Sequence, residues 1–244
     1  MILRNADANW DQWPVEVYLN ENYRQVHSCD AAVIEHHSAF YRRFPAASIA
    51  TSIELGAGPN LYPLMLGAAA SRQIDALEYS LANATYLRRQ LSDGADASWQ
   101  AFYTRCRELN PDLPSRLATA LTRVRVQQGD VRAVKTGRYD LASMNFVAES
   151  ISEDRAEVAS FCRTFTRSVR PGGYLVAAFM ENMARYHLGD GSHWPGYPTD
   201  SADIDEFFAP YTDELAITRI DSDPSLPAYG YTGMILLTAR RRED

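Results

Sequence analysis

Short apolar runs alternate with amphipathic stretches along most of this 244-residue chain. The run at residues 174–180 is apolar at every position, which is typical of a central strand buried on both faces. Together the runs predict an α/β fold with a doubly wound, mostly parallel seven-stranded sheet. The predicted strands are residues 51–55, 73–78, 124–131, 139–146, 174–180, 215–220 and 234–239.

Between the strands, apolar positions recur at helical spacing. The first 25 residues carry several aromatic side chains ahead of the first strand and predict a helical arm. We expect one domain over residues 1–244, with a helical arm or lid at 1–45 and an α/β core at 50–244 that contains a helical insertion at about 92–120. The other predicted helices are residues 29–44, 60–70, 81–91, 158–169 and 202–211.

One segment joins an apolar run to a glycine turn, and a second apolar run ending in Glu78 follows it. Gly56 and Gly58 let the backbone pass close to a ligand where a Cβ atom would clash. The carboxylate lies about 20 residues beyond the turn, where it can accept hydrogen bonds from both hydroxyls of a ribose. This unit predicts a nucleoside site.

The loop also bears on which nucleoside is bound. A dinucleotide fingerprint needs a third small residue where strand and helix pack closely, and here that position is Leu61, preceded by Pro59 and Asn60. The loop therefore suits a nucleoside without a pyrophosphate, and S-adenosylmethionine (SAM) is the common cofactor of that kind. On this motif alone, a dinucleotide and a purely structural turn stay open.

Composition narrows the class of protein. A net charge of −7 argues against a nucleic-acid partner, because there is no basic field to bind phosphates. Three widely spaced cysteines predict reduced core thiols and neither a disulfide framework nor a metal site. The polar N-terminus and the lack of a run of membrane length predict a cytoplasmic protein without a membrane partner.

Four features fall in order at predicted strand ends: the glycine turn, Glu78, Asp130, and the pair Asn145-Phe146. In open α/β sheets, ligands bind at the carboxyl ends of the strands. We therefore expect these four features to meet at one cofactor site.

From about residue 15 to its end, the chain resembles the class I SAM-dependent methyltransferases. Within that class it is similar to the nicotinamide, phenylethanolamine and indolethylamine N-methyltransferase group. The resemblance implies a Rossmann-like methyltransferase fold with an N-terminal helical lid. The matching segments are Tyr18-Leu19-x-x-x-Tyr23, Leu55-Gly56-x-Gly58-Pro59-x-x-Tyr62, Glu78-Tyr79-Ser80-x-x-Asn83, Gly129-Asp130-Val131 and Arg170-Pro171-Gly172-Gly173.

The resemblance also implies roles for the residues at the cofactor end. Glu78 would bind the ribose diol, while the Asp130 carboxylate would accept from the adenine amino group. Tyr18 and Tyr23 would close over the cofactor. For each residue a purely structural role is the alternative. The expected cofactor-binding residues are Tyr18, Tyr23, Gly56, Gly58, Asn60, Glu78, Tyr79, Asn83, Asp130, Val131, Asn145 and Phe146.

On the acceptor side, the catalytic candidates are Phe179, Glu149 and Asn182. Glu149 falls where the phenylethanolamine enzyme carries an acid that contacts the substrate amine, and a helix-start charge is its alternative. Phe179 is expected to face the reactive end of the cofactor from the end of the central strand. The expected substrate-binding residues are Glu181, Tyr186, His193 and Trp194. The spacing of the histidines predicts no metal site.

One departure from the family pattern concerns the acceptor. Nicotinamide-type enzymes carry an Asp where this chain has Phe179, and serines where it has Met183 and Ala184. The groups that would orient a nicotinamide amide are therefore missing. We expect an acceptor other than nicotinamide, as in bacterial secondary metabolism.

Three functions are compatible with these residues. The first is N- or O-methylation of a small molecule by a monomer or homodimer. The second keeps the SAM site but cyclises SAM to azetidine-2-carboxylate, with release of methylthioadenosine. The third is a regulatory protein that binds SAM or a nucleoside without catalysis.

Overall fold

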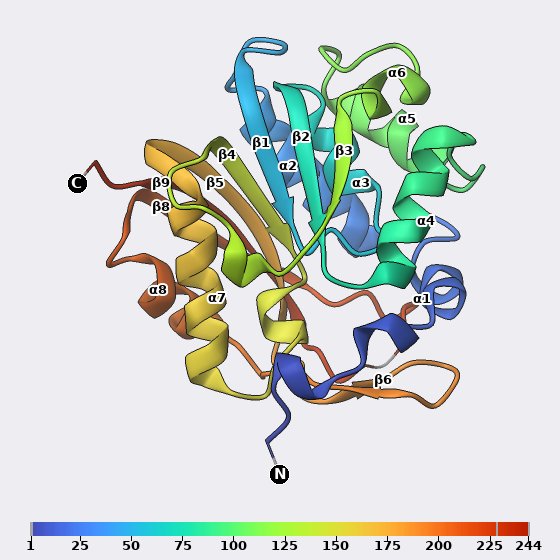
Figure 1. Ribbon diagram of the computed structural model, residues 1–244. Coiled ribbons are helices and arrows are strands. Elements are labelled where there is room, and N and C mark those ends of the chain that lie inside the picture. The colour runs from blue at the N-terminus through green and yellow to red at the C-terminus, as the bar shows by residue number, and fades with distance from the viewer. Residues whose placement is uncertain (1, 228, 244) are drawn as a thin grey trace.

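The computed structural model describes residues 2–227 and 229–243, and it contains a seven-stranded sheet in the order β3-β2-β1-β4-β5-β9-β8 (Figure 1). Strands β1 to β5 pair in parallel, and β9 pairs antiparallel with both of its neighbours. The predicted doubly wound, mostly parallel sheet is confirmed. The strands are β1 (Ile49–Leu55), β2 (Ser71–Glu78), β3 (Val124–Gln128), β4 (Tyr139–Asn145), β5 (Val169–Glu181), β8 (Thr212–Asp221) and β9 (Gly233–Arg241).

Helices cover both faces of the sheet. In Figure 1, α7 and α8 lie in front of it, and α2 and α3 lie behind. The helices are α1 (Val15–Asn22), α2 (Ser28–Tyr41), α3 (Tyr62–Gly67), α4 (Leu81–Ser92), α5 (Trp99–Leu109), α6 (Leu117–Leu121), α7 (Arg155–Ser168) and α8 (Ser201–Phe208). Short 3₁₀ helices are η1 (Asn5–Asp7), η2 (Trp10–Gln12), η3 (Val131–Ala133) and η4 (Ala148–Ser150).

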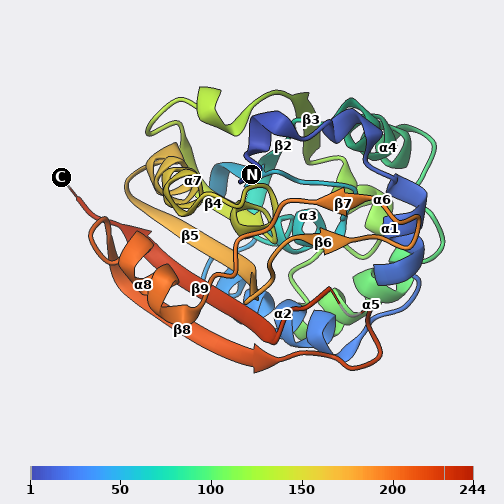
Figure 2. The ribbon, with the colours of Figure 1, turned by 90° about the horizontal axis from the view of Figure 1, so that it is seen from below.

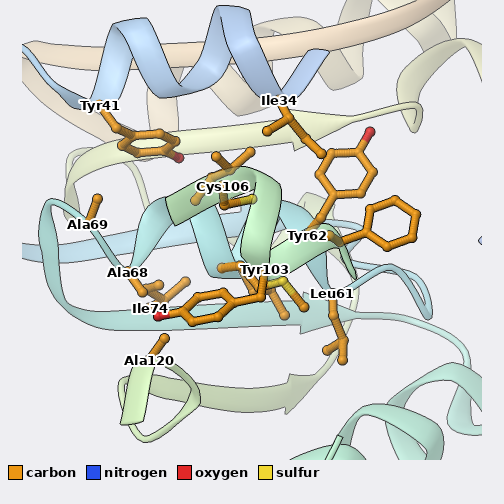
Figure 3. Close-up of a cluster of buried hydrophobic side chains, with 14 of the residues drawn as sticks. Ile34, Tyr41, Leu61, Tyr62, Ala68, Ala69, Ile74, Tyr103, Cys106 and Ala120 are labelled. Atoms are coloured by element: carbon orange, nitrogen blue, oxygen red, sulfur yellow. The ribbon is translucent and has the colours of Figure 1, made fainter. Parts of the chain in front are cut away.

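Two apolar cores lie on the two faces, and the alternation of side chains along a strand divides residues between them. Val176 and Ala178 of β5 pack with α2, α3 and α5, whereas Leu175, Ala177 and Phe179 pack with α7 and α8. Ile34 and Tyr41 project from α2 into the first core (Figure 3). None of the helices among the described residues has the length and apolar character that crossing a membrane requires.

Two segments outside the sheet lie at the end where the parallel strands finish. The first is the N-terminal segment, residues 5–22, and the second is the hairpin of β6 (Tyr186–His187) and β7 (His193–Trp194). They appear together beneath the sheet in Figure 1 and near each other in Figure 2. A third aromatic cluster joins them: Trp10 stacks on Trp194, with ring centroids 5.1 Å apart. We call these two segments the roof.

Candidate active site

A deep pocket opens between the carboxyl ends of the parallel strands and the roof. It encloses about 1270 Å³ of empty space, part of which is open to solvent. All of the residues predicted to bind the cofactor line this pocket, although their individual roles stay predictions. They are Tyr18, Tyr23, Gly56, Gly58, Asn60, Glu78, Tyr79, Asn83, Asp130, Val131, Asn145 and Phe146.

The glycine turn after β1 forms one wall of the pocket. Gly56 and Gly58 have φ values of 64° and 56°, in the left-handed region that a side chain disfavours. A Cβ atom on Gly56 would lie 2.6 Å from Cγ1 of Val147. The Gly58 N–H donates to Oε2 of Glu78 at 2.7 Å. The glycines therefore let the loop close onto the carboxylate at the end of the neighbouring strand.

Glu78 is held in a fixed orientation by the protein itself. Its Oε1 accepts from the Ser80 N–H at 2.8 Å and from Nδ2 of Asn83 at 3.3 Å. Burial raises the pKa of this carboxyl, while the backbone donors act in the opposite direction. Oδ1 of Asn83 is buried and has no partner among the residues that the structure describes. A ribose diol fits here, since the carboxylate keeps lone pairs free and the Asn83 oxygen lacks a donor.

Asp130 is engaged in a way that the sequence did not indicate. Its carboxylate accepts from the Arg132 backbone N–H at 2.8 Å and from Nε of Arg132 at 2.9 and 3.0 Å. The hydrogen bonds from the guanidinium hold the pKa of Asp130 below its usual range. An adenine amino group at this position would therefore share the carboxylate with Arg132.

Hydroxyl groups converge where the N-terminal segment meets the glycine turn. The Tyr18 and Tyr23 oxygens lie 3.3 Å apart, and Nδ2 of Asn60 donates to the Tyr23 oxygen at 3.1 Å. Burial raises the pKa of Tyr18 to about 12 and that of Tyr23 well above its usual value. Both hydroxyls therefore stay protonated at neutral pH, as donors to a ligand carboxylate must.

Asn145, at the end of β4, is fixed from behind the pocket. Its Oδ1 lies 2.9 Å from Nε2 of His37, and its Nδ2 donates to Oε1 of Glu54 at 3.0 Å. The Ser143 hydroxyl also donates to Glu54. Burial lowers the pKa of His37 to about 3 and raises that of Glu54 to about 7, so the histidine stays neutral. His37 and Glu54 are thus positioning residues for the pocket that sequence reasoning missed.

Phe179 does not face the pocket, and this corrects the prediction. Its side chain is fully buried on the α7–α8 side of the sheet, with its ring centroid 6.1 Å from that of Phe208. The next residue, Met180, lines the pocket instead. The cause is the two-residue alternation of the strand, which places Phe179 with Leu175 and Ala177.

The other two catalytic candidates also lie outside the pocket lining. Glu149 is completely buried, and its Oε1 accepts from the Met180 N–H at 2.8 Å. Its Oε2 has no partner among the described residues, and burial raises its pKa to about 7. Asn182 is exposed and donates to the Thr232 hydroxyl at 2.9 Å.

Of the substrate-binding candidates, one lines the pocket and the others do not. Tyr186 lines the pocket, whereas Trp194 packs on Trp10 behind it and holds the roof together. His193 is exposed on the hairpin. Glu181 is paired with Arg219 at 2.8 Å, because the end of β5 turns it toward β8. In the part of the chain that the structure describes, no group of His, Cys, Asp and Glu could hold a metal ion.

The comparisons with known proteins agree on family and fold. The sequence profile of the family described as NNMT/PNMT/TEMT matches residues 3–241. No curated protein matches the sequence.

Solved structures share the fold at low sequence identity. The N-methyltransferase NodS from Bradyrhizobium japonicum in complex with S-adenosylhomocysteine (SAH) is 13% identical with a TM-score of 0.52, covering 97% of this chain and 94% of that one. The 1,6-didemethyltoxoflavin-N1-methyltransferase from Burkholderia thailandensis is 16% identical with a TM-score of 0.50, covering 88% and 80%. The [4+2]-cyclase SpnF is 12% identical with a TM-score of 0.57, covering 88% and 82%. At these identities the likeness shows the fold alone.

Proposed function

We propose that this chain, which belongs to the NNMT/PNMT/TEMT family, is a SAM-dependent methyltransferase that acts on a small molecule. One observation carries the proposal. In the glycine turn, the Gly58 N–H donates to Glu78 at the end of the next strand, and the unpartnered oxygen of Asn83 lies beside that carboxylate. The chain that holds this arrangement matches the family over nearly its whole length. That arrangement suits a nucleoside cofactor without a pyrophosphate.

The residues fit SAM along the whole pocket. Glu78 and Asn83 would hold the ribose, and Asp130 with Val131 would hold the adenine. The protonated hydroxyls of Tyr18 and Tyr23, with Asn60, suit the carboxylate of the methionine moiety. SAM and SAH are the ligands named for proteins of this fold, among them the SAH complex of NodS, which supports the same cofactor here.

The cofactor, when bound, supplies a methyl group that its sulfonium already activates. The chain then has to align the acceptor and keep water out. Holding the reactants in line can contribute about 7–11 kcal/mol to lowering the barrier. Apolar side chains suited to this task line the pocket: Phe146, Ile151, Met180, Met183 and Tyr186.

The charge of the pocket bears on the acceptor. Among the described residues, no Lys, Arg or His side chain lines it. An anionic acceptor would therefore find no counter-charge, and a neutral or cationic one is favoured.

The remaining aspects of the function follow from these features. The acceptor is a small molecule and not a nucleic acid, because the net charge of −7 opposes a phosphate backbone. We infer that residues 1–45 act as a lid on an α/β core at 50–244, that the protein is a monomer or homodimer, and that it works in the cytoplasm. We infer that nicotinamide is not the acceptor, because Met183 lines the pocket where the nicotinamide-type pattern has a serine. Phe179 no longer supports that inference, since its side chain points away from the pocket.

The decisive experiment is product analysis after incubation with SAM alone and with candidate acceptors. A methyltransferase forms SAH only when an acceptor is present. Methylthioadenosine formed from SAM alone would instead identify the cyclising enzyme. Calorimetric titration with SAH provides the control for binding, with an expected stoichiometry of one. Preferential binding of NAD would overturn the proposal.

A further inference from the structure

Asp30 differs from the other acids of the pocket. Three carboxylates line the cavity: Glu78, Asp130 and Asp30. Glu78 is held by two backbone N–H groups and an asparagine, and Asp130 is paired with Arg132. For Asp30 the structure records a single hydrogen bond, a long one of 3.3 Å from the His27 N–H to Oδ2. It therefore lines the pocket without a cation.

The local structure explains one hydrogen bond of the side chain but does not require a carboxylate. Asp30 is the third residue of α2 and accepts from the backbone N–H of the N-cap residue His27. A neutral amide oxygen at that position can accept the same bond, so capping alone needs no carboxylate. Asp30 is only 4% exposed, and burial together with nearby Asp223 raises its pKa to about 7. A buried carboxylate without a partner is costly, which favours a ligand that completes it.

The surroundings of Asp30 suit a cation that also donates hydrogen bonds. It shares the pocket with Tyr18, Tyr23 and Tyr231. The buried Tyr231 hydroxyl has no hydrogen-bond partner among the described residues, and its oxygen can accept a bond from an ammonium group.

We propose that Asp30 is the counter-ion of a protonated aliphatic amine bound in this pocket. The proposal rests on the proposed function, since it places the amine beside the cofactor. Two amines have this chemistry: the α-ammonium group of the cofactor's methionine moiety and an amino group on the acceptor. Both are compatible with a carboxylate that lines the same pocket as Tyr18, Tyr23 and Tyr231.

The test compares Asp30→Asn with Glu35→Gln, which removes an exposed charge from the same helix. Asparagine keeps the cap and the volume of the side chain. Each protein is titrated calorimetrically at pH 8 with SAH and with 5′-methylthioadenosine, which lacks the amino-acid tail. Benzylamine and benzyl alcohol are then titrated in the presence of saturating SAH. Thermal melts check folding, and Asp30→Gln, which is uncharged and is a usual residue at the third position of a capping box, replaces any Asp30→Asn protein that does not fold.

Loss of the charge-assisted bond should weaken binding of the paired amine by about tenfold or more. If the cofactor provides the amine, Asp30→Asn loses affinity for SAH but keeps that for methylthioadenosine. If the acceptor provides it, SAH binding is unchanged and benzylamine loses affinity while benzyl alcohol does not.

The proposal is overturned if the folded variant binds both SAH and benzylamine as tightly as wild type does. It is also overturned if SAH binding is unchanged and wild type does not bind benzylamine. Failure of wild type to bind SAH at all would instead overturn the proposed function. Glu35→Gln should match wild type in every titration, and a loss there would show a general effect of charge that also overturns the role of Asp30.

Discussion

The two ends of the pocket are built differently. At the strand-end side, Glu78, Asn83 and Asp130 already have protein partners that fix their positions before a ligand arrives. Elsewhere in the pocket, Asp30 on α2 has one weak hydrogen bond, and the Trp13 N–H in the roof has no partner among the described residues. The first end is preorganised for a ligand of constant shape, whereas the second leaves polar groups open.

The difference has a structural origin. The strand-end side consists of turns that follow adjacent parallel strands, where backbone donors such as the Gly58 N–H are fixed by the sheet register. The roof consists of two short 3₁₀ helices, α1 and a hairpin of two-residue strands, which contact each other through aromatic rings. The comparison shows that one fold can hold polar groups rigidly at the strand ends and leave other polar groups of the same pocket without protein partners.

The largest expected effect is the loss of stability in Phe179→Ala. This variant tests whether Phe179 belongs to the core or to the pocket. Because its ring fills the α7–α8 core, Phe179→Ala should lower the free energy of unfolding by about 3–5 kcal/mol, while the affinity for SAH stays within about twofold of wild type. The matched control is Phe146→Ala, on the neighbouring strand end but inside the pocket. It should lose SAH affinity and little stability. Denaturant unfolding and calorimetry measure both, and the reverse pattern would restore Phe179 to the site.

The preorganised end is tested next, by Glu78→Gln. The amide keeps the shape but offers one acceptor instead of two, so a diol loses a charge-assisted bond worth about 1.5–3 kcal/mol. We expect SAH affinity to fall by roughly 10- to 150-fold in calorimetric titration. Glu108→Gln, an exposed change on α5, provides the control. Unchanged affinity in a folded Glu78→Gln protein would contradict the ribose assignment.

The next prediction concerns Glu149, a buried acid without a cationic partner, and its effect on the free energy of unfolding. Burial raises its pKa to about 7 from an ordinary value near 4.5, so the folded state holds a proton that the unfolded state loses first. Its contribution to stability is therefore complete below about pH 4.5 and is lost as the pH rises through 7.

In the Glu149→Gln protein this loss is absent. Relative to wild type, the variant should gain on the order of 1–3 kcal/mol in free energy of unfolding between pH 4.5 and pH 8. Urea unfolding across that range measures the difference, with Glu153→Gln as control, since the pKa of that partly exposed carboxyl is lowered by Arg185. A difference that stays flat with pH would show that Glu149 is not a buried, protonated acid.

The sequence predicted those parts of the molecule that depend on local order. Gly56 and Gly58 lie in the turn after β1 and Glu78 ends β2, and the structure brings all three into one pocket. The seven strands and the family were predicted correctly for the same reason, because both depend on patterns within short segments.

The features that the sequence did not predict depend on which face of a strand a side chain takes, or on contacts between residues far apart in the chain. Residues 174–180 are apolar throughout, so no alternation revealed which face Phe179 takes. His37 reaches Asn145 across 108 residues, and Asp30 enters the pocket from a helix that carries no motif. Such contacts follow from tertiary packing, and the spacing of residues within a short segment does not predict them.

The smallest effect concerns the roof, whose role as a lid is still a prediction. Tyr18 and Tyr23 line the pocket from the N-terminal segment, and a ligand there would add contacts that hold the segment down. Amide hydrogen exchange of residues 15–25 should therefore slow by roughly tenfold when SAH is bound, which corresponds to about 1.4 kcal/mol. Exchange in β5 should not change, because that strand is central and buried with or without ligand. Equal protection of residues 15–25 in both states would make the segment an ordinary packed helix, and the two ends of the pocket would then be equally rigid.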